Sequence, residues 1–397
     1  MRIRYVIHNA YAGGGTVRTT LSMAAALAER GHDVEVASVV QRRRQPVFPV
    51  APGVKLVSLT GFRPRRAHPG TPGNAVRWAT RVALRRTHSR LAHPRDTRWA
   101  TFTLAHDHAV RRYVRAQKDC VVISTRLTLN LALGTLRTDR QVAIAQEHNH
   151  LTPHLDLRAD YADRYAGLDA LTVLTEVDAA AYRRVLGDGC PVVVVPNALP
   201  HDTVRRHSPL SAPVAVAAGA LIRRKGFDLL IDAWRTVAAA CPQWRLRIYG
   251  TGEERASLQS RIERAGLAEV VSLEGFNRDM AARFDEASLF VLSSRREGMP
   301  MVLLEAMAAG LPVVAFDCPT GPAELLDGGR SGVLVPVGDS AALADGILQV
   351  LTDPAEQRRL ADAAEARASA FDISATAARW ESLFEELADR RGLSVGR

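Results

Sequence analysis

The 397-residue chain is poor in several features that would assign it to a protein class directly. It has no run of about 18 uncharged apolar residues, so the sequence predicts no membrane-spanning helix. Its four cysteines are scattered and form no CxxC pair, which argues against a zinc site and a disulfide framework. No Asp-x-Asp sequence occurs, although a divalent ion that bridges a diphosphate usually binds such carboxylates. We therefore expect no metal and no other cofactor.

Other signatures are missing as well. There is no GxSxG sequence, so a nucleophilic triad is unsupported. No aromatic-basic RNA motif or helix-turn-helix pattern occurs, so we expect no nucleic-acid partner. The N-terminal stretch MRIRYVIHNAYAGGG is a short apolar run that ends in glycines, unlike a signal peptide with its cleavage site. The expected location is the cytoplasm.

Lysine is scarce, whereas arginine is abundant. The chain has only Lys55, Lys118 and Lys225 among 52 basic residues, and its net charge is +10. Between Arg63 and Lys118, fourteen basic residues accompany two acidic ones. Amphipathic stretches in this window favour a surface for anionic lipid or for an anionic acceptor. The alternative is a solvated helical face in an arginine-rich chain.

What the chain does have is a regular alternation of strand-like apolar runs with amphipathic helical runs. This order predicts α/β architecture with parallel sheets. In the first half the predicted strands are 3–10, 33–40, 120–125, 141–146, 170–175 and 191–196, with a helix at 16–31. In the second half they are 214–221, 245–250, 270–275, 289–294 and 313–316, with helices at 227–241, 253–266 and 302–309.

The length and the restart of this pattern predict two Rossmann-like domains. Residues 196–213 are rich in Pro, Ser and Asn and lack an apolar period, so we place the linker there. The predicted domains are 1–198 and 199–372. Residues 373–397 contain an amphipathic helix that we expect to pack back on the first domain.

Each half begins with a strand followed by a glycine-containing loop. Gly13-Gly14-Gly15 follows the first strand, but no glycine occupies position 18, so this is not the dinucleotide GxGxxG sequence. Gly219–Gly226 follows the first strand of the second half and carries Arg223, Arg224 and Lys225, which could hold a diphosphate. The alternatives are a tight turn without a ligand in the first loop and a basic helix entry in the second.

The most informative segment runs from Arg295 to Pro322. Glu297 precedes a small-residue loop, and Glu305 lies in the first turns of the helix that follows. A helix entered through such a loop offers unpaired N–H groups and a positive dipole end to an anion. The two carboxylates can bind sugar or ribose hydroxyls, so the segment suits a nucleotide-sugar.

His148 follows the predicted strand 141–146 and belongs at the carboxyl edge of its sheet. A histidine there could donate a hydrogen bond to a sugar or a phosphate, or act as an acid or base. His150 and His154 are close competitors, and an exposed loop histidine without a function is the alternative.

In their order and spacing, Gly13–Arg18, Gly219–Gly226 and Glu297–Glu305 resemble the family 4 retaining glycosyltransferases of the GT-B fold, in which two Rossmann-like domains face a central cleft. Pro196-Asn197 and DCPTGP at 317–322 match the same pattern. The chain departs from it at Ala220, where the family commonly has an arginine that binds phosphate. Arg223 or Arg224 is the candidate to compensate.

The resemblance implies roles for individual residues. Glu297 would contact the hydroxyls of the donor sugar, Glu305 the ribose, and Arg224 with Lys225 the diphosphate, while His148 would steady the transferred sugar. The implied catalytic residues are His148, Arg224, Lys225 and Glu297. The implied donor-binding residues are Gly14, Gly15, Gly219, Arg224, Lys225, Phe276, Glu297, Gly298, Met299, Pro300, Met301, Val302 and Glu305.

The implied activity is metal-independent transfer of a hexosyl unit, with retention, from a UDP- or GDP-sugar to a hydroxyl acceptor; ADP also stays open as the nucleotide. The acceptor would be a saccharide, a lipid-linked glycan or a polymer of the cell envelope. Contact of region 63–118 with anionic lipid would place the protein on the inner face of the plasma membrane. Two other hypotheses are a sugar-nucleotide epimerase and a basic binding protein without chemistry.

Overall fold

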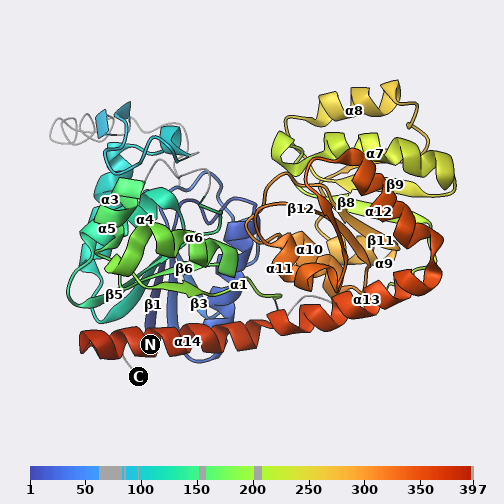
Figure 1. Cartoon of the computed structure of the whole chain (residues 1–397). Helices are drawn as coiled ribbons and strands as arrows, with labels where there is room; N and C mark the ends of the chain where they lie inside the picture. Colours follow the sequence, from blue (N-terminus) through green and yellow to red (C-terminus); the bar gives the residue numbers. More distant parts are fainter. Residues whose placement is uncertain (62–82, 85, 97, 152–157, 201–207, 395–397) are drawn as a thin grey trace. The chain divides into compact units, whose positions relative to one another are not determined.

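The computed structural model describes residues 1–61, 83–84, 86–96, 98–151, 158–200 and 208–394. The chain forms two compact units (Figure 1). One consists of Met1–Ala198 together with Ile373–Arg397, and the other of Leu199–Asp372. We call them the N-unit and the C-unit.

The N-unit is built on a seven-stranded sheet with strand order β3-β2-β1-β4-β5-β6-β7, and every described pairing is parallel. Its strands are β1 (Arg2–Ile7), β2 (Asp33–Ser38), β3 (Val54–Ser58), β4 (Cys120–Ser124), β5 (Gln141–Gln146), β6 (Ala170–Val173) and β7 (Val192–Val194). The α-helices are α1 (Gly15–Glu29), α3 (Leu104–Ala116), α4 (Leu127–Leu136), α5 (Arg158–Tyr165), α6 (Glu176–Leu186) and α14 (Ile373–Arg391); η1 (Trp99–Thr101) and η3 (Gly187–Gly189) are 3₁₀ turns.

Helices cover both faces of this sheet, which is why its central strands are apolar on both sides. Ile3, Tyr5 and Ile7 of β1 belong to a core with α1 and α14, whereas Val6 belongs to a second core with α4, α5 and α6. Because successive side chains of a strand point to opposite faces, one apolar run supplies both cores. Figure 1 shows α14 in red alongside the N-unit, and α14 contacts α1 and β5.

The C-unit has a six-stranded parallel sheet with strand order β10-β9-β8-β11-β12-β13. Its strands are β8 (Val214–Ala218), β9 (Arg245–Tyr249), β10 (Val271–Gly275), β11 (Leu289–Leu292), β12 (Val313–Asp317) and β13 (Val333–Pro336). The α-helices are α7 (Phe227–Ala240), α8 (Arg255–Arg264), α9 (Met280–Asp285), α10 (Met301–Ala308), α11 (Pro322–Leu325), α12 (Ser340–Thr352) and α13 (Pro354–Ala368); η4 (Arg223–Lys225), η5 (Asp327–Gly329) and η6 (Ser369–Phe371) are 3₁₀ turns.

Both sheets show the outward-running strand order of doubly wound folds, so the predicted class of two Rossmann-like domains is confirmed. All the predicted strands are present, and most of them end one to three residues earlier, because the strand ladder stops where the chain turns into the following loop. The sequence analysis missed β3 and β13, which are short strands at the edges of their sheets. Within the basic window 63–118, residues 63–82, 85 and 97 lie outside the described residues.

Candidate functional site

In the C-unit, two loops at the carboxyl edge of the sheet are fastened to each other. The backbone N–H of Arg295, after β11, donates to the carbonyl of Arg224 in η4 at 2.9 Å. The Arg295 guanidinium donates to both carboxylate oxygens of Asp228 at 2.7 Å and to the Arg223 carbonyl at 2.8 Å. Ser293 Oγ donates to the carbonyl of Lys225 at 3.0 Å. The loop after β8 and the loop after β11 therefore form one polar assembly.

At the centre of this assembly lies the carboxylate of Glu297. Lys225 Nζ donates to its Oε1 at 2.5 Å, and Arg224 Nη1 donates to its Oε2 at 3.1 Å. Ser294 Oγ adds a hydrogen bond to Oε1 at 2.6 Å. The Glu297 side chain is only 7% exposed and that of Lys225 12% exposed, so this ion pair is largely shielded from water.

Burial alone would raise the pKa of Glu297, but the charges of Lys225 and Arg224 outweigh it and hold that pKa below its usual range. Glu297 is therefore ionised at neutral pH, and it already has two cations. Arg224 is the arginine beside Lys225, while Arg223 is exposed and offers its carbonyl to Arg295. Of the two candidates to replace the arginine absent at Ala220, Arg224 is the one placed with Lys225.

Glycines set the spacing of these loops. An ideal Cβ on Gly219 would lie 3.2 Å from Cε of Lys225, so the side chain of that lysine runs over the glycine. Gly321 has φ 93°, and a Cβ there would lie 2.3 Å from the carbonyl oxygen of Gly298. Around it, the N–H of Glu297 donates to the Pro319 carbonyl and that of Thr320 donates to the Glu297 carbonyl, both at 2.9 Å. The segment 317–322 thus holds the Glu297–Gly298 loop in place.

The remaining predicted donor residues of the C-unit follow β11 or the edge strand β10, whereas Gly14 and Gly15 belong to the N-unit. Gly298, Met299 and Pro300 lead into α10, which begins with Met301 and Val302, so its first N–H groups lie at the same edge. Glu305 is the fifth residue of α10 and is 8% exposed. Phe276 follows β10 and is 61% exposed, which is unusual for a large apolar side chain among the described residues.

In the N-unit, His148 lies just beyond β5 and is half-buried. Its Nε2 has no hydrogen-bond partner among the described residues. Burial lowers its pKa to about 4, so the ring is neutral at neutral pH. His150 is buried, and His154 lies outside the described residues.

Gly14 and Gly15 form the start of α1 in the N-unit. Gly14 is the N-cap with φ 135°, a conformation that favours glycine. An ideal Cβ on either residue would have no described atom within 4 Å. The fold itself therefore leaves space next to this helix start, at the carboxyl edge of β1.

A buried network behind His148 was not predicted. The carboxylate of Glu147 accepts hydrogen bonds from Asn130 Nδ2 at 2.8 Å and from the Tyr165 hydroxyl at 2.9 Å. Asn130 Oδ1 accepts from Ser124 Oγ at 2.6 Å, which ties the ends of β4 and β5 together. Burial raises the pKa of Glu147 to about 7. The only sequence signal was an acidic residue directly after an apolar strand.

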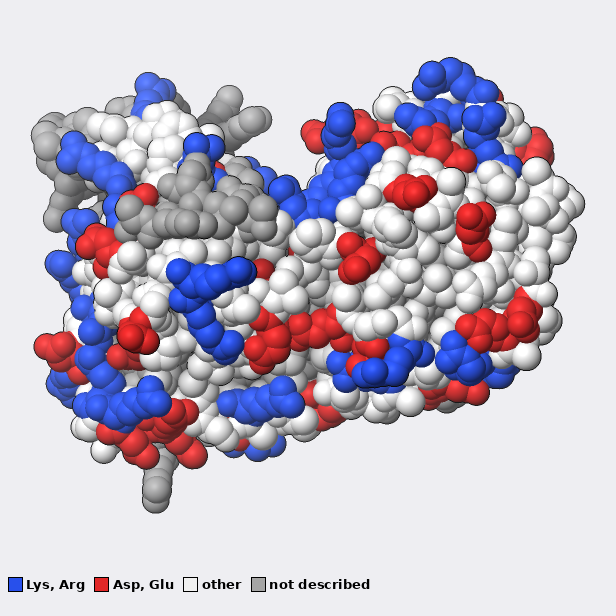
Figure 2. All heavy atoms as spheres, in the orientation of Figure 1, with Lys and Arg blue, Asp and Glu red and all other residues white. Residues whose placement is uncertain are grey.

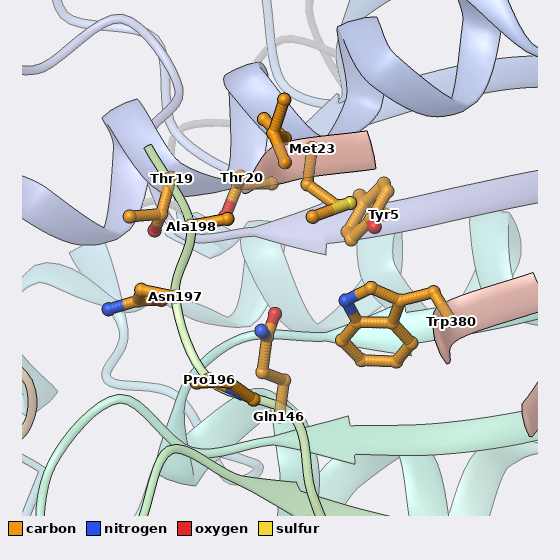
Figure 3. Close-up of a pocket in the computed structure, with 10 residues that line it drawn as sticks. Tyr5, Thr19, Thr20, Met23, Gln146, Pro196, Asn197, Ala198 and Trp380 are labelled. Carbon is orange, nitrogen blue, oxygen red and sulfur yellow. The ribbon is translucent and has the colours of Figure 1, made fainter. Parts of the chain in front are cut away.

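Figure 3 shows a small cavity in the N-unit, between α1, α14 and the chain after β7. Its lining includes the Tyr5 hydroxyl, which is buried without a hydrogen-bond partner among the described residues, together with Gln146, Asn197 and Trp380. The cavity has room for about one water molecule and is too small for a sugar.

Metal-binding side-chain clusters and membrane-spanning helices are both absent from the part of the chain that the structure describes. No group of three or more His, Cys, Asp or Glu side chains is arranged to hold a metal ion there. Within the same residues, no helix combines the length and apolarity needed to cross a bilayer.

Residues 212–353 match the family described as "Glycosyl transferases group 1". An exopolysaccharide phosphotransferase from Streptomyces coelicolor is 34% identical over 394 residues, which are 98% of this chain and 41% of that protein. The amylovoran biosynthesis glycosyltransferase AmsD from Erwinia amylovora is 38% identical over 111 residues, 28% of this chain and 31% of that protein. The chain thus spans less than half the length of either relative.

Among solved structures, S. aureus TarM in complex with fondaparinux, alpha-GlcNAc-glycerol and UDP superimposes with a TM-score of 0.75. The two are 12% identical, and the match covers 96% of this chain and 99% of that one, so it bears on the fold alone. The two parallel sheets and the likeness to TarM thus agree on the fold, and the family match is confined to residues 212–353 of the C-unit.

Proposed function

We propose that the protein transfers a hexosyl unit, with retention of configuration and without a metal ion, from a UDP- or GDP-sugar to a hydroxyl acceptor. The C-unit binds the donor and the N-unit binds the acceptor. The observation that carries the proposal is the assembly of Lys225 and Arg224 on Glu297 at the carboxyl edge of the C-unit sheet. This edge is where open α/β sheets bind their ligands.

In the proposed reaction, the bond between the anomeric carbon and the diphosphate oxygen breaks while the acceptor oxygen bonds to the same carbon. The acceptor proton passes to the departing diphosphate. Lys225, Arg224 and the N–H groups at the start of α10 stabilise the negative charge that grows on the leaving group. Phe276 and Glu305 bind the nucleoside, and Gly14 and Gly15 leave room for the ligand.

The hydrogen bonds of the Glu297 carboxylate fit a retaining mechanism without a protein nucleophile. A double-displacement mechanism needs a carboxylate that is free to attack the anomeric carbon. Glu297 is instead held by Lys225, Arg224 and Ser294, an arrangement suited to orienting sugar hydroxyls rather than to attack. We therefore propose front-face attack assisted by the departing phosphate, with His148 as a neutral hydrogen-bond donor to the transferred sugar.

The biological setting proposed is the synthesis of a cell-envelope glycan, glycolipid or polymer. By their names, the relatives above are an exopolysaccharide phosphotransferase and a glycosyltransferase of amylovoran biosynthesis. The name of the Streptomyces coelicolor relative refers to phosphotransfer, but this chain matches only 41% of it, so that activity need not reside in the shared part. We propose a cytoplasmic enzyme whose basic region 63–118 contacts the inner face of the plasma membrane.

The two other hypotheses make different demands. An epimerase needs an additional acid and base near the anomeric carbon, whereas the ionisable side chains of the C-unit assembly are paired with one another. A basic protein that binds nucleic acid needs a surface of one sign. Figure 2 shows Lys and Arg side chains beside Asp and Glu side chains over the viewed faces of both units.

A transfer assay tests the proposal. The purified chain is first screened with UDP, GDP and ADP and with their sugars by thermal shift. The donor that binds is then incubated with candidate acceptors, and nucleoside diphosphate and glycosylated product are quantified. Equal amounts of both support transfer. An epimerised nucleotide-sugar without diphosphate release, or no nucleotide binding at all, contradicts it.

A further inference from the structure

The carboxyl edge of the N-unit sheet carries arginines of which only some are paired with a carboxylate among the described residues. His8 follows β1, Arg42 follows β2 and Arg126 follows β4, and Arg98 adjoins η1. Strands β2, β1 and β4 are neighbours in a parallel sheet, so these residues come together at one edge. We call His8, Arg42, Arg98 and Arg126 the basic edge cluster.

The contacts of His8 fix its surroundings. Its Nε2 lies 2.9 Å from Thr101 Oγ1, and that hydroxyl donates to the Arg98 carbonyl at 2.7 Å. The ring lies 4.8 Å from that of Phe102, centroid to centroid. His8 is thus anchored beside η1 and the residue before it.

The pKa of His8 reflects its burial and the charges around it. Burial is the largest cause that lowers its pKa, and the charges of Arg126, Arg98 and Arg42 lower it further, to about 3. Asp96 acts in the opposite direction but does not offset them. The edge is positive enough to help keep an imidazole neutral.

Asp96, the acid beside His8 that acts on its pKa, is already bound to other groups. The Asp96 side chain is fully buried, and its carboxylate receives Arg126 Nε at 2.8 and 3.0 Å and the N–H of Arg98 at 2.8 Å. Within the described ranges, the guanidinium groups of Arg42 and Arg98 form no ion pair, and both side chains are exposed. The cluster therefore has two cations available to a ligand.

His148 lies on the same edge, because the strand order is β1-β4-β5. Neighbouring strands are about 4.8 Å apart, so the ends of β1 and β5 are roughly 10 Å apart, with Arg126 between them. A phosphorylated sugar can span such a distance. One ligand could therefore place a hydroxyl near His148 and an anionic group near the cluster.

Resting on the proposed function, we infer that the acceptor of this enzyme is a saccharide that carries a phosphate or carboxylate group, and that Arg42 and Arg98 of the basic edge cluster bind this group. A membrane fits the cluster less well. The large apolar side chains that are exposed among the described residues are Val177, Phe276 and Val337, and none belongs to the cluster, so nothing here would insert into lipid.

The test is a calorimetric titration of the full chain with glucose 6-phosphate and, separately, with glucose. In the double variant Arg42→Gln/Arg98→Gln, we expect affinity for glucose 6-phosphate to fall by about tenfold or more, because two charge-assisted hydrogen bonds are lost. Arg111→Gln/Arg112→Gln is the matched control: it removes two exposed arginines of the same unit, from α3, and should leave this affinity unchanged.

Two further readouts locate the binding. An anion beside His8 should raise the pKa of its ring, whereas an anion bound elsewhere should not. This pKa is measured by NMR. Phosphatidylglycerol vesicles form the lipid arm, and Arg42→Gln/Arg98→Gln should bind them no more weakly than Arg111→Gln/Arg112→Gln does.

No saturable binding of glucose 6-phosphate, or equal weakening in the two double variants, overturns the inference. So does a loss of vesicle binding confined to Arg42→Gln/Arg98→Gln, which would make the bound phosphate a lipid headgroup. If glucose 6-phosphate binds as expected but no nucleotide-sugar is turned over, the proposed function fails and the anion site stands. Turnover without such binding rejects the anion site alone.

Discussion

The carboxyl edges of the two sheets use their cations in opposite ways. In the C-unit, Lys225 and Arg224 are both bound to the buried carboxylate of Glu297, and Arg295 is bound to Asp228. In the N-unit, Arg126 has Asp96, but Arg42 and Arg98 form no described ion pair. The C-unit edge is thus assembled without a ligand, whereas the N-unit edge leaves two positive charges available to bind a ligand.

This difference teaches which ligand part each edge recognises. A group common to all donors, such as a diphosphate, is best met by a rigid arrangement that needs no reorganisation. An acceptor that differs among enzymes of one fold is met by exposed side chains on variable loops.

The first prediction concerns the preassembled edge. Lys225→Met should lower kcat/KM for transfer by about two to three orders of magnitude, because it removes a cation from the leaving-group site. It also leaves Glu297 buried without its nearest partner, which should cost about 3 kcal/mol of unfolding free energy in denaturant titrations.

Adding Glu297→Gln to Lys225→Met should restore part of that stability but none of the activity. Arg330→Met, which breaks an exposed pair with Asp327 in the same unit, is the control and should change neither measurement. Unchanged transfer in Lys225→Met would remove the basis of the donor site.

The site residues of the C-unit edge could be predicted from the sequence, whereas those of the N-unit edge cluster could not. The loops at Gly219–Gly226 and 293–302 could be predicted because glycines, a basic run and two acids follow apolar strands in one short pattern. The basic edge cluster could not, because its residues follow three different strands and become neighbours only through the sheet order. Glu147 was missed for a similar reason: its partners come from α4 and α5.

The second prediction concerns Glu147 in the N-unit. Its pKa of about 7 in the folded state exceeds the ordinary value of 4.5, so the stability associated with its neutral form is present at low pH and is lost as the pH rises toward 7. Glu147→Gln keeps the acceptor oxygen for Asn130 and Tyr165 but cannot ionise. It should stabilise the protein at pH 8 by up to about 3 kcal/mol.

At pH 5 the same variant and the wild type should unfold at nearly the same temperature, which makes low pH the internal control. A Glu147→Gln protein less stable than wild type at pH 8 would mean that the carboxylate is charged and favourably held.

The third prediction concerns backbone strain in the C-unit. Gly321→Ala places a Cβ against the Gly298 carbonyl at a positive φ, and should cost about 2 kcal/mol of unfolding free energy while displacing the loop beside Glu297. Gly328→Ala is the matched control, since Gly328 has φ 64° but open space around its Cβ. If the two variants lose equal stability, the contact with Gly298 is unimportant.

The fourth and smallest effect concerns Gly15 at the start of α1. Gly15→Ala meets no described atom and should raise the unfolding free energy by about 0.5 kcal/mol, because alanine restricts the unfolded chain. Transfer should nevertheless weaken, since the added methyl group occupies space left for the ligand. Increased stability with unchanged KM values for both substrates would show that the space is not used.

Hydrogen–deuterium exchange of the full chain, with and without the nucleoside diphosphate that binds it best, tests directly whether the C-unit edge binds the donor. The account predicts slower exchange in Gly219–Gly226 and in residues 293–305, where Lys225, Arg224 and the start of α10 would hold the diphosphate. Protection confined to the N-unit, with these two C-unit segments unchanged, would contradict it.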